Sequence, residues 1–148
     1  MKPFVFPLER VRDYKEQLLE GEKIRLAELR RRREEILRRI EELSAYIEEK
    51  NRQLQRMQEE GAYVSEIISL RFMIENAAEQ REAALAELNR ATAEVELQRQ
   101  KVIGLSQELN GFDRLKERKL EEYRYLEAQE SREQILEHLT TQIAFGGH

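Results

Sequence analysis

The chain has 148 residues, of which 38% are charged and 40% hydrophobic, with two prolines, no cysteine, no tryptophan and a formal net charge of −4. The absence of cysteine excludes disulfides and thiolate metal sites, and it fits a reducing cytoplasm. The apolar residues suffice for a seam between helices and are too few for a wide core, so the composition favours a rod over a globule.

The first eight residues contain a short apolar run broken by Pro3 and Pro7. This run is too short for a signal peptide or a membrane span, so we expect a cytoplasmic protein without direct membrane insertion. Pro7 suits the first turn of a helix, where its missing N–H donor costs no hydrogen bond. A helix is therefore predicted to begin near residue 8.

The first predicted helix extends over residues 8–60. Apolar residues recur along it at alternating spacings of three and four, which is typical of a helix packed along a partner helix. Gly61 predicts a left-handed stop after Glu60. The stripe consists of Leu26, Leu29, Arg33, Ile36, Ile40, Leu43, Ile47, Lys50, Leu54, Met57, Gly61 and Val64.

The first helix also holds the densest basic run of the chain, Arg30 to Arg33, followed by Arg38 and Arg39. No aromatic side chains accompany these arginines as a stacking platform for bases. Glutamates are interleaved at helical neighbour spacing, so we expect a solvated, salt-bridged face. An acidic protein partner is the alternative, and nucleic acid is the least favoured ligand. The interleaved residues are Glu28, Glu34, Glu35, Glu41 and Glu42.

A turn at about 61–65 leads to a second predicted helix, residues 66–143, with Ser65 as its cap. Because short connections join antiparallel neighbours, the predicted fold is all-α: one domain, an antiparallel two-helix coiled-coil hairpin with an overhanging, longer C-terminal helix. The stripe of the second helix consists of Ile67, Leu70, Ile74, Ala77, Arg81, Ala84, Leu88, Ala91, Val95, Gln98, Val102, Leu105, Leu109, Phe112, Lys116, Lys119, Tyr123 and Leu126.

The register follows from a turn centred near residue 63. Large residues of the first helix, Ile36 to Ile47, are then opposite the small residues of the second, Ala77 to Ala91. The same register puts Gly21 level with Gly104, which predicts either a bend or tight crossing, or two tolerated surface glycines.

The first helix is predicted to end opposite residue 118, which leaves the rest of the second helix unpaired. A lone helix with large apolar groups frays or associates, so this overhang requires a partner. Its apolar residues are Leu120, Tyr123, Leu126, Ile135, Leu136, Leu139 and Ile143.

No residue pattern indicates catalysis. The sequence has no phosphate loop, no HExxH motif and no Ser-His-acid set. The two histidines, His138 and His148, are not expected to bind a metal. We therefore expect a protein that is not an enzyme and needs no cofactor.

Two terminal patterns are distinctive. One is Phe4-x-Phe6-x-Leu8-x-x-Val11, and the other is FDRLKERKLEEY at residues 112–123, followed by regularly spaced glutamates. Together with the polar heptads between them, these patterns resemble the flagellar type III export protein FliJ family over the whole chain. Members often have an Asp-Glu pair where this chain has Glu137-His138.

The resemblance implies a non-catalytic stalk and adaptor at the cytoplasmic face of the inner membrane. FliJ-like proteins insert their terminal end into the hexameric flagellar export ATPase FliI, contact the export gate protein FlhA and recycle export chaperones. Contacts with the ATPase ring are then expected at Phe4, Phe6, Leu8, Leu120, Tyr123, Leu126, Ile135, Leu136 and Leu139.

The resemblance also implies a surface for the export gate. Leu70, Ile74 and Ala77 of this set are also seam positions and are better interpreted as core, whereas Tyr46 lies outside the seam. The implied gate contacts are Arg39, Leu43, Tyr46, Lys50, Leu70, Ile74, Ala77 and Arg81.

Other functions remain open at this point. The same hairpin suits the stalk of a virulence type III secretion system. It also suits a structural homo-oligomer in which the overhangs of two copies cover each other, or a nucleic-acid-binding rod that uses Arg30 to Arg39.

Overall fold

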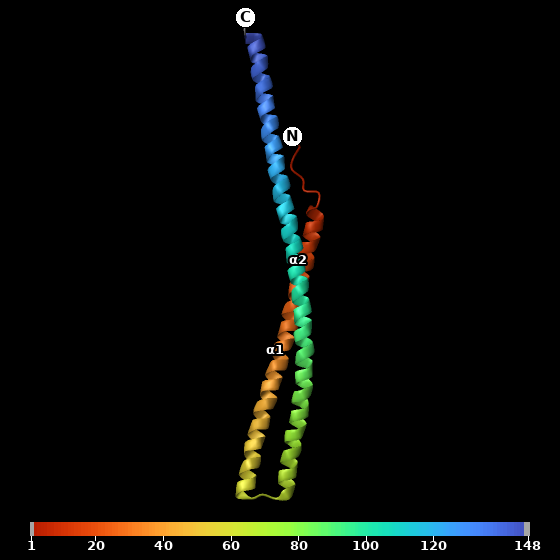
Figure 1. The fold of residues 1–148 in the computed structure, drawn as a ribbon, viewed down its shortest axis with the longest axis vertical. Helices are drawn as coiled ribbons and strands as arrows, with labels where there is room; N and C mark the ends of the chain where they lie inside the picture. Colours follow the sequence, from red (N-terminus) through yellow and green to blue (C-terminus); the bar gives the residue numbers. More distant parts are fainter. Residues whose placement is uncertain (1, 147–148) are drawn as a thin grey trace. The chain divides into compact units, whose positions relative to one another are not determined.

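The computed structural model describes residues 2–146. It contains two long helices, α1 (Glu9–Glu60) and α2 (Val64–Gly146), joined by a short connection (Figure 1). Residues 2–8 precede α1 and are not helical, and no strand occurs within residues 2–146. The predicted all-α helical hairpin is confirmed.

The connection reverses the chain in three residues. Gly61 has a φ of 85°, and its N–H donates to the carbonyl of Met57 at 2.9 Å, which is the hydrogen bond of a left-handed helix stop. The prediction for Gly61 is confirmed.

The cap predicted for α2 is wrong. The carbonyl of Tyr63 accepts the first helical hydrogen bonds, from the N–H groups of Glu66 at 3.0 Å and Ile67 at 3.3 Å. Because Gly61 completes the reversal so early, α2 begins at Val64 and Ser65 lies inside its first turn. At its other end, α2 continues to Gly146, past the expected residue 143, because no proline interrupts it.

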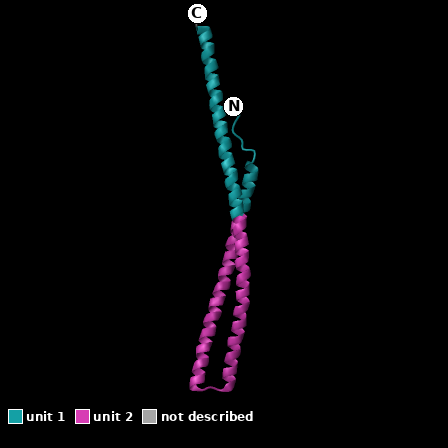
Figure 2. Ribbon diagram, viewed as in Figure 1, with its two compact units in different colours: residues 1–20, 103–148 teal, residues 21–102 magenta. Residues whose placement is uncertain are grey.

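The chain divides into two compact units (Figure 2). Unit 1 comprises Met1–Glu20 and Ile103–His148, and unit 2 comprises Gly21–Val102. Within each unit a part of α1 lies beside a part of α2 that runs in the opposite direction. Each unit therefore has a two-helix seam of its own.

The seam of unit 2 packs large residues of α1 against mainly small residues of α2, as the sequence predicted. A cluster of Leu26, Leu29 and Val95, with Val102 against it, forms its most continuous apolar part. Alanine at the facing positions lets the two backbones approach closely. The other buried residues of this seam are Ile36, Ile47, Leu70, Ala77, Ala84 and Ala91.

Contacts across the seams locate the register. Arg12 was predicted to be level with residue 114, and it contacts Asp113. Arg39 was predicted to be level with residue 87, but it donates to Gln80, about two helical turns nearer the connection. Gln98 shows the same displacement, because it was predicted to be level with residue 28 and contacts Glu22. The predicted register of unit 2 is therefore wrong by about six residues, whereas that at Arg12 is nearly right.

Two polar positions of the α2 stripe are satisfied within the fold. Gln98 is buried, and its amide donates to the main-chain carbonyl of Glu22 at 3.0 Å and also contacts the carboxylate of Glu22. Lys116 forms an ion pair with Glu9 at 2.9 Å. Since buried polar groups need partners, these two pairs also fix which residues face each other.

No close approach between the helices requires glycine at position 21 or 104. A Cβ atom added at either position would meet no other atom within 4 Å. The predicted tight crossing at these glycines is therefore wrong, whereas the alternative of a bend stays a prediction.

Candidate partner-binding surfaces

Three ion pairs hold the start of α1 against α2 in unit 1. Along α1 the residues Glu9, Arg12 and Lys15 are one turn apart, and their partners Lys116, Asp113 and Glu108 follow in reverse order along α2. The N···O distances are 2.9, 2.9 and 3.0 Å. Since each charge meets the opposite sign only in this antiparallel register, the pairs discourage sliding of the helices.

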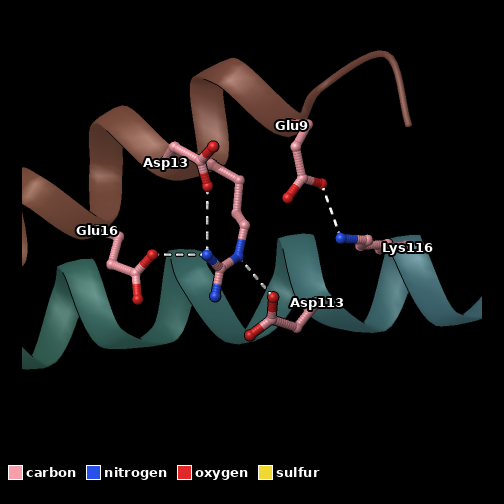
Figure 3. Close-up of polar contacts among 6 residues, drawn as sticks. Glu9, Asp13, Glu16, Asp113 and Lys116 are labelled. Atoms are coloured by element: carbon pink, nitrogen blue, oxygen red, sulfur yellow. Dashed lines mark hydrogen bonds and ion pairs between the residues drawn. The ribbon is translucent and has the colours of Figure 1, made fainter. Parts of the chain in front are cut away.

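Arg12 is the centre of this set. Its guanidinium lies 3.4, 2.7 and 2.9 Å from the carboxylates of Asp13, Glu16 and Asp113, which Figure 3 labels. The hydrogen bond to Asp113 is the largest cause that raises the pKa of Arg12, and Glu16 adds to it. The group is thus held as a cation where the two helices meet.

The N-terminal segment, residues 2–8, packs on α2 in unit 1. The Tyr123 hydroxyl donates to the carbonyl of Lys2 at 2.5 Å, and its ring lies 5.6 Å from the ring of Phe4 in a tilted arrangement. Phe6 is buried, with only 6% of its surface exposed. Burial of the Tyr123 hydroxyl, followed by its interaction with Glu127, raises the pKa of that phenol.

These contacts correct the expectation that α2 is unpaired beyond residue 118. An extended chain advances more than twice as far per residue as a helix. Residues 2–8 therefore continue along α2 past the start of α1 and reach Tyr123. A groove of about 690 Å³ remains between this segment and the stretch of α2 from Lys119 to Leu126.

Beyond this groove, large apolar side chains of α2 are exposed. We call Ile135, Leu136 and Leu139, which lie on one side of the helix, the C-terminal apolar face; each of them is exposed, as are Leu126, Ile143 and Phe145. The residues of the expected ring-contact set thus differ in exposure. Phe4, Phe6 and Tyr123 contact partners within the chain or are buried, and Leu120 is half-buried. Leu8, Leu126 and the C-terminal apolar face are exposed.

The residues expected to contact the export gate are not all on the surface. Leu70 and Ala77 have only 4% of their surface exposed, so they belong to the seam, as their heptad positions indicated. Ile74, Leu43, Lys50 and Arg81 are half-buried beside it.

Tyr46 and Arg39 are the exposed members of this set. Lys50 lies 5.4 Å from the centre of the Tyr46 ring, and Arg39 is held by Gln80. Tyr46 and Leu43 also line a groove of about 260 Å³ together with Phe72, Met73 and Asn76 of α2. We call this the hairpin groove.

Sequence reasoning missed Phe72, which is 69% exposed at the rim of the hairpin groove. The available signal was a second apolar spacing on α2, Val64, Ile68 and Phe72 at intervals of four, outside the seam. All three side chains are exposed, so this spacing marks a surface and not a core.

The basic run of α1 does not form the salt-bridged face that the sequence predicted. Within residues 2–146 no ion pair is formed by Arg30 to Arg33 or by Arg38, although the glutamates occupy neighbouring turns. Exposed ion pairs of this kind contribute little free energy, because water solvates both charges and ordering the long side chains costs entropy.

Within residues 2–146 no group of three or more His, Asp and Glu side chains is arranged to hold a metal ion. His138 contacts Gln142 at 3.1 Å on α2, and His148 lies outside the described residues. Neither described helix has a stretch long and apolar enough to cross a membrane.

Comparison with known proteins gives one finding. The family model of the flagellar FliJ protein matches residues 4–137, which include α1, most of α2 and nearly all of the N-terminal segment. The chain belongs to the flagellar FliJ family. Comparisons with curated proteins and with solved structures gave no match.

Membership in the FliJ family makes this chain a coiled-coil protein of flagellar type III export. The matched range begins at Phe4 and includes Tyr123, so both sides of the N-terminal contact are within it. It ends at Glu137, so most of the C-terminal apolar face is also within the matched range.

Proposed function

We propose that this FliJ family protein is a non-catalytic stalk and adaptor of the flagellar export apparatus, acting at the cytoplasmic face of the inner membrane. The observation that carries the proposal is the C-terminal apolar face of α2. Its side chains are exposed. Exposed apolar groups at this density are typical of a surface that a partner covers.

The proposed partner of this face is the hexameric export ATPase FliI, whose ring would take up the end of α2. Leu126, Ile135, Leu136 and Leu139 then lose their contact with water inside the ring. Phe4, Phe6, Leu8, Leu120 and Tyr123 lie at the entrance and set where the inserted part of α2 begins. If the ring binds α2 better than a free subunit does, α2 favours the assembled ring.

The hairpin groove is the proposed contact with the export gate protein FlhA. Tyr46 and Arg39 are accessible there, and Phe72 extends the surface that the sequence indicated. Leu70 supports this surface from the seam, and Ala77 lies at the base of the hairpin groove with only 4% of its surface exposed. Export chaperones are further proposed partners, for which no residue of the chain is singled out.

Ring assembly tests the proposal. Replacing both Leu136 and Leu139 by Asp places two charges on the C-terminal apolar face without touching a seam. We expect this variant to lose its effect on FliI hexamer formation, measured by sedimentation velocity with purified proteins.

The control is Ile24→Asp, which adds a charge at an exposed apolar residue of α1 far along the sequence from this face. It should promote hexamer formation as wild type does. Unchanged hexamer formation with Leu136→Asp/Leu139→Asp would contradict insertion of α2. A loss for both variants would also contradict it, because the effect would then not depend on this face.

A further inference from the structure

Apart from Arg39, the proposed stalk does not use the basic run of α1. Residues 23–39 hold eight Lys and Arg against three Glu. Residues 81–97 lie between the contacts of Gln98 with Glu22 and of Gln80 with Arg39, and they hold two Arg against four Glu. This level of unit 2 is therefore positive in a chain whose formal net charge is −4.

A groove lies beside this run. It has a volume of about 740 Å³, and its lining includes Arg25, Leu29 and Arg32 of α1 with Glu94, Leu97 and Lys101 of α2. We call it the basic groove. All three cations are exposed, and none of them forms an ion pair or hydrogen bond within residues 2–146. One carboxylate, Glu94, is also without an ion pair there, so the groove retains an excess of positive charge.

The groove also has apolar surface. Leu29 is buried at its base, whereas Leu97 is 69% exposed although it lies among charged side chains. A leucine at a solvent-facing helix position buries apolar area only if something packs on it. The basic groove therefore combines positive charge with an apolar contact.

The spacing indicates the form of the ligand. Arg25 and Arg32 are seven residues apart on one helix, about 10 Å along its axis. An α-helix packed in the groove of a two-helix coiled coil presents residues at the same interval. A helix with carboxylates seven residues apart and a leucine between them would meet both arginines and Leu97 at once.

We propose that the basic groove binds an acidic amphipathic helix of another protein. Nucleic acid fits less well, because no aromatic side chain lines the groove and Glu94 would face phosphate. An anionic membrane also fits less well, because the apolar contact lies in a groove between two helices and not on one outward helix face.

A designed peptide tests the chemistry. The probe is a fluorescently labelled helix of about three heptads with Glu at the flanking positions and Leu at the central ones, and the control peptide has Gln in place of each Glu. We expect the intact protein to bind the Glu peptide in a fluorescence anisotropy titration. Its affinity for the Gln peptide should be lower by a factor of about ten or more.

Two charge-matched variants locate the site. Arg25→Gln/Arg32→Gln/Lys101→Gln removes the cations of the basic groove, and Arg52→Gln/Arg56→Gln/Arg71→Gln removes three cations elsewhere in unit 2. The first variant should weaken binding of the Glu peptide about tenfold, or roughly 1.4 kcal/mol, and the second should not. Leu97→Ala should also weaken binding, since it removes the apolar contact without changing charge.

Three results would overturn the inference. Equal binding of the Glu and Gln peptides would show that charge is not recognised. Equal losses in the two triple variants would show that only net charge matters. Tighter binding of duplex DNA or of phosphatidylglycerol vesicles than of the Glu peptide, with loss in the first triple variant, would assign the groove to one of those ligands.

Discussion

At the scale of single residues, two glycines on these helices have opposite roles. Gly61 has a positive φ that a side chain adopts at a cost of about 1 kcal/mol, whereas Gly104 is a helical residue with space around it. We expect Gly61→Ala to lower the thermal unfolding midpoint and Gly104→Ala to raise it, because alanine gains about 1 kcal/mol in a helix interior. Circular dichroism melts of both variants check this, and a higher midpoint for Gly61→Ala would contradict the left-handed stop.

Tyr123 is expected to hold the N-terminal segment on α2. Chymotrypsin cleaves after aromatic residues in mobile chain, so its rate of cleavage after Phe4 measures how often this segment leaves α2. Tyr123→Ala should be cleaved much faster than wild type, and Tyr123→Phe should be intermediate, since it keeps the ring contact with Phe4 and loses the hydrogen bond to Lys2.

The matched control is Tyr125→Ala, because Tyr125 is exposed two residues away on the same helix. It should be cleaved at the wild-type rate. Equal rates for Tyr123→Ala and Tyr125→Ala would mean that the Tyr123 contact does not hold the segment.

Glu96 gives a prediction about pH. Hydrogen bonds from Arg99, at 2.8 and 3.0 Å, and then from Gln100 lower the pKa of this carboxyl from 4.5 to about 2. Because the folded-state pKa is the lower one, the contribution of this carboxylate to stability is complete above about pH 4.5 and is lost as the pH falls toward 2. In an NMR titration the pKa of Glu96 should rise in Arg99→Gln, and an unchanged pKa would rule out Arg99 as its cause.

At the scale of the helices, the seam gives the largest expected change in stability. Ile36 is buried in it, whereas Ile24 on the same helix is exposed. Ile36→Asp places a charge in the seam and should destabilise the hairpin by more than about 3 kcal/mol, while Ile24→Asp should change little. Ile40 is only half-buried, so Ile40→Asp should lie between them. Urea unfolding of the three variants measures this order, and similar midpoints for Ile36→Asp and Ile24→Asp would mean that the seam is misplaced.

The sequence predicted the helices well because their signals are local or periodic. The heptad spacing identified the buried residues of both helices except Leu19, and Gly61 identified the stop after α1. The cap of α2 was missed because Ser65 is a good cap by residue type, while the left-handed Gly61 lets the helix begin before it. No local pattern reveals how few residues a reversal needs.

The candidate surfaces were less predictable. The length of α2 that α1 covers was estimated from helical rise alone, so the reach of the extended residues 2–8 was missed. The ion pairs of Glu9, Arg12 and Lys15 depend on the exact register of the two helices. The position of the turn gives that register only to within a turn or two of helix. The basic run was read as a salt-bridged face because its glutamates have the right spacing, yet spacing permits an exposed ion pair without making it stable.

At the scale of the whole molecule, the two helices differ in what they can offer a partner. Helix α1 has 52 residues and α2 has 83, and Ile135, Leu136 and Leu139 near the end of α2 are exposed. This difference in length is what the proposed insertion into the ATPase ring requires, and it needs no active site on the chain. The hairpin groove and the basic groove lie in unit 2 and leave the C-terminal apolar face free.

The most direct measurement of the central claim is ATP hydrolysis by purified FliI titrated with full-length protein and with a variant that lacks residues 127–148. The deletion keeps Tyr123, the N-terminal segment and the ion pairs of unit 1, so the remaining hairpin should stay helical by circular dichroism. Full-length protein should stimulate hydrolysis and the truncated protein should not. Equal stimulation by both would contradict the insertion of α2 into the ring.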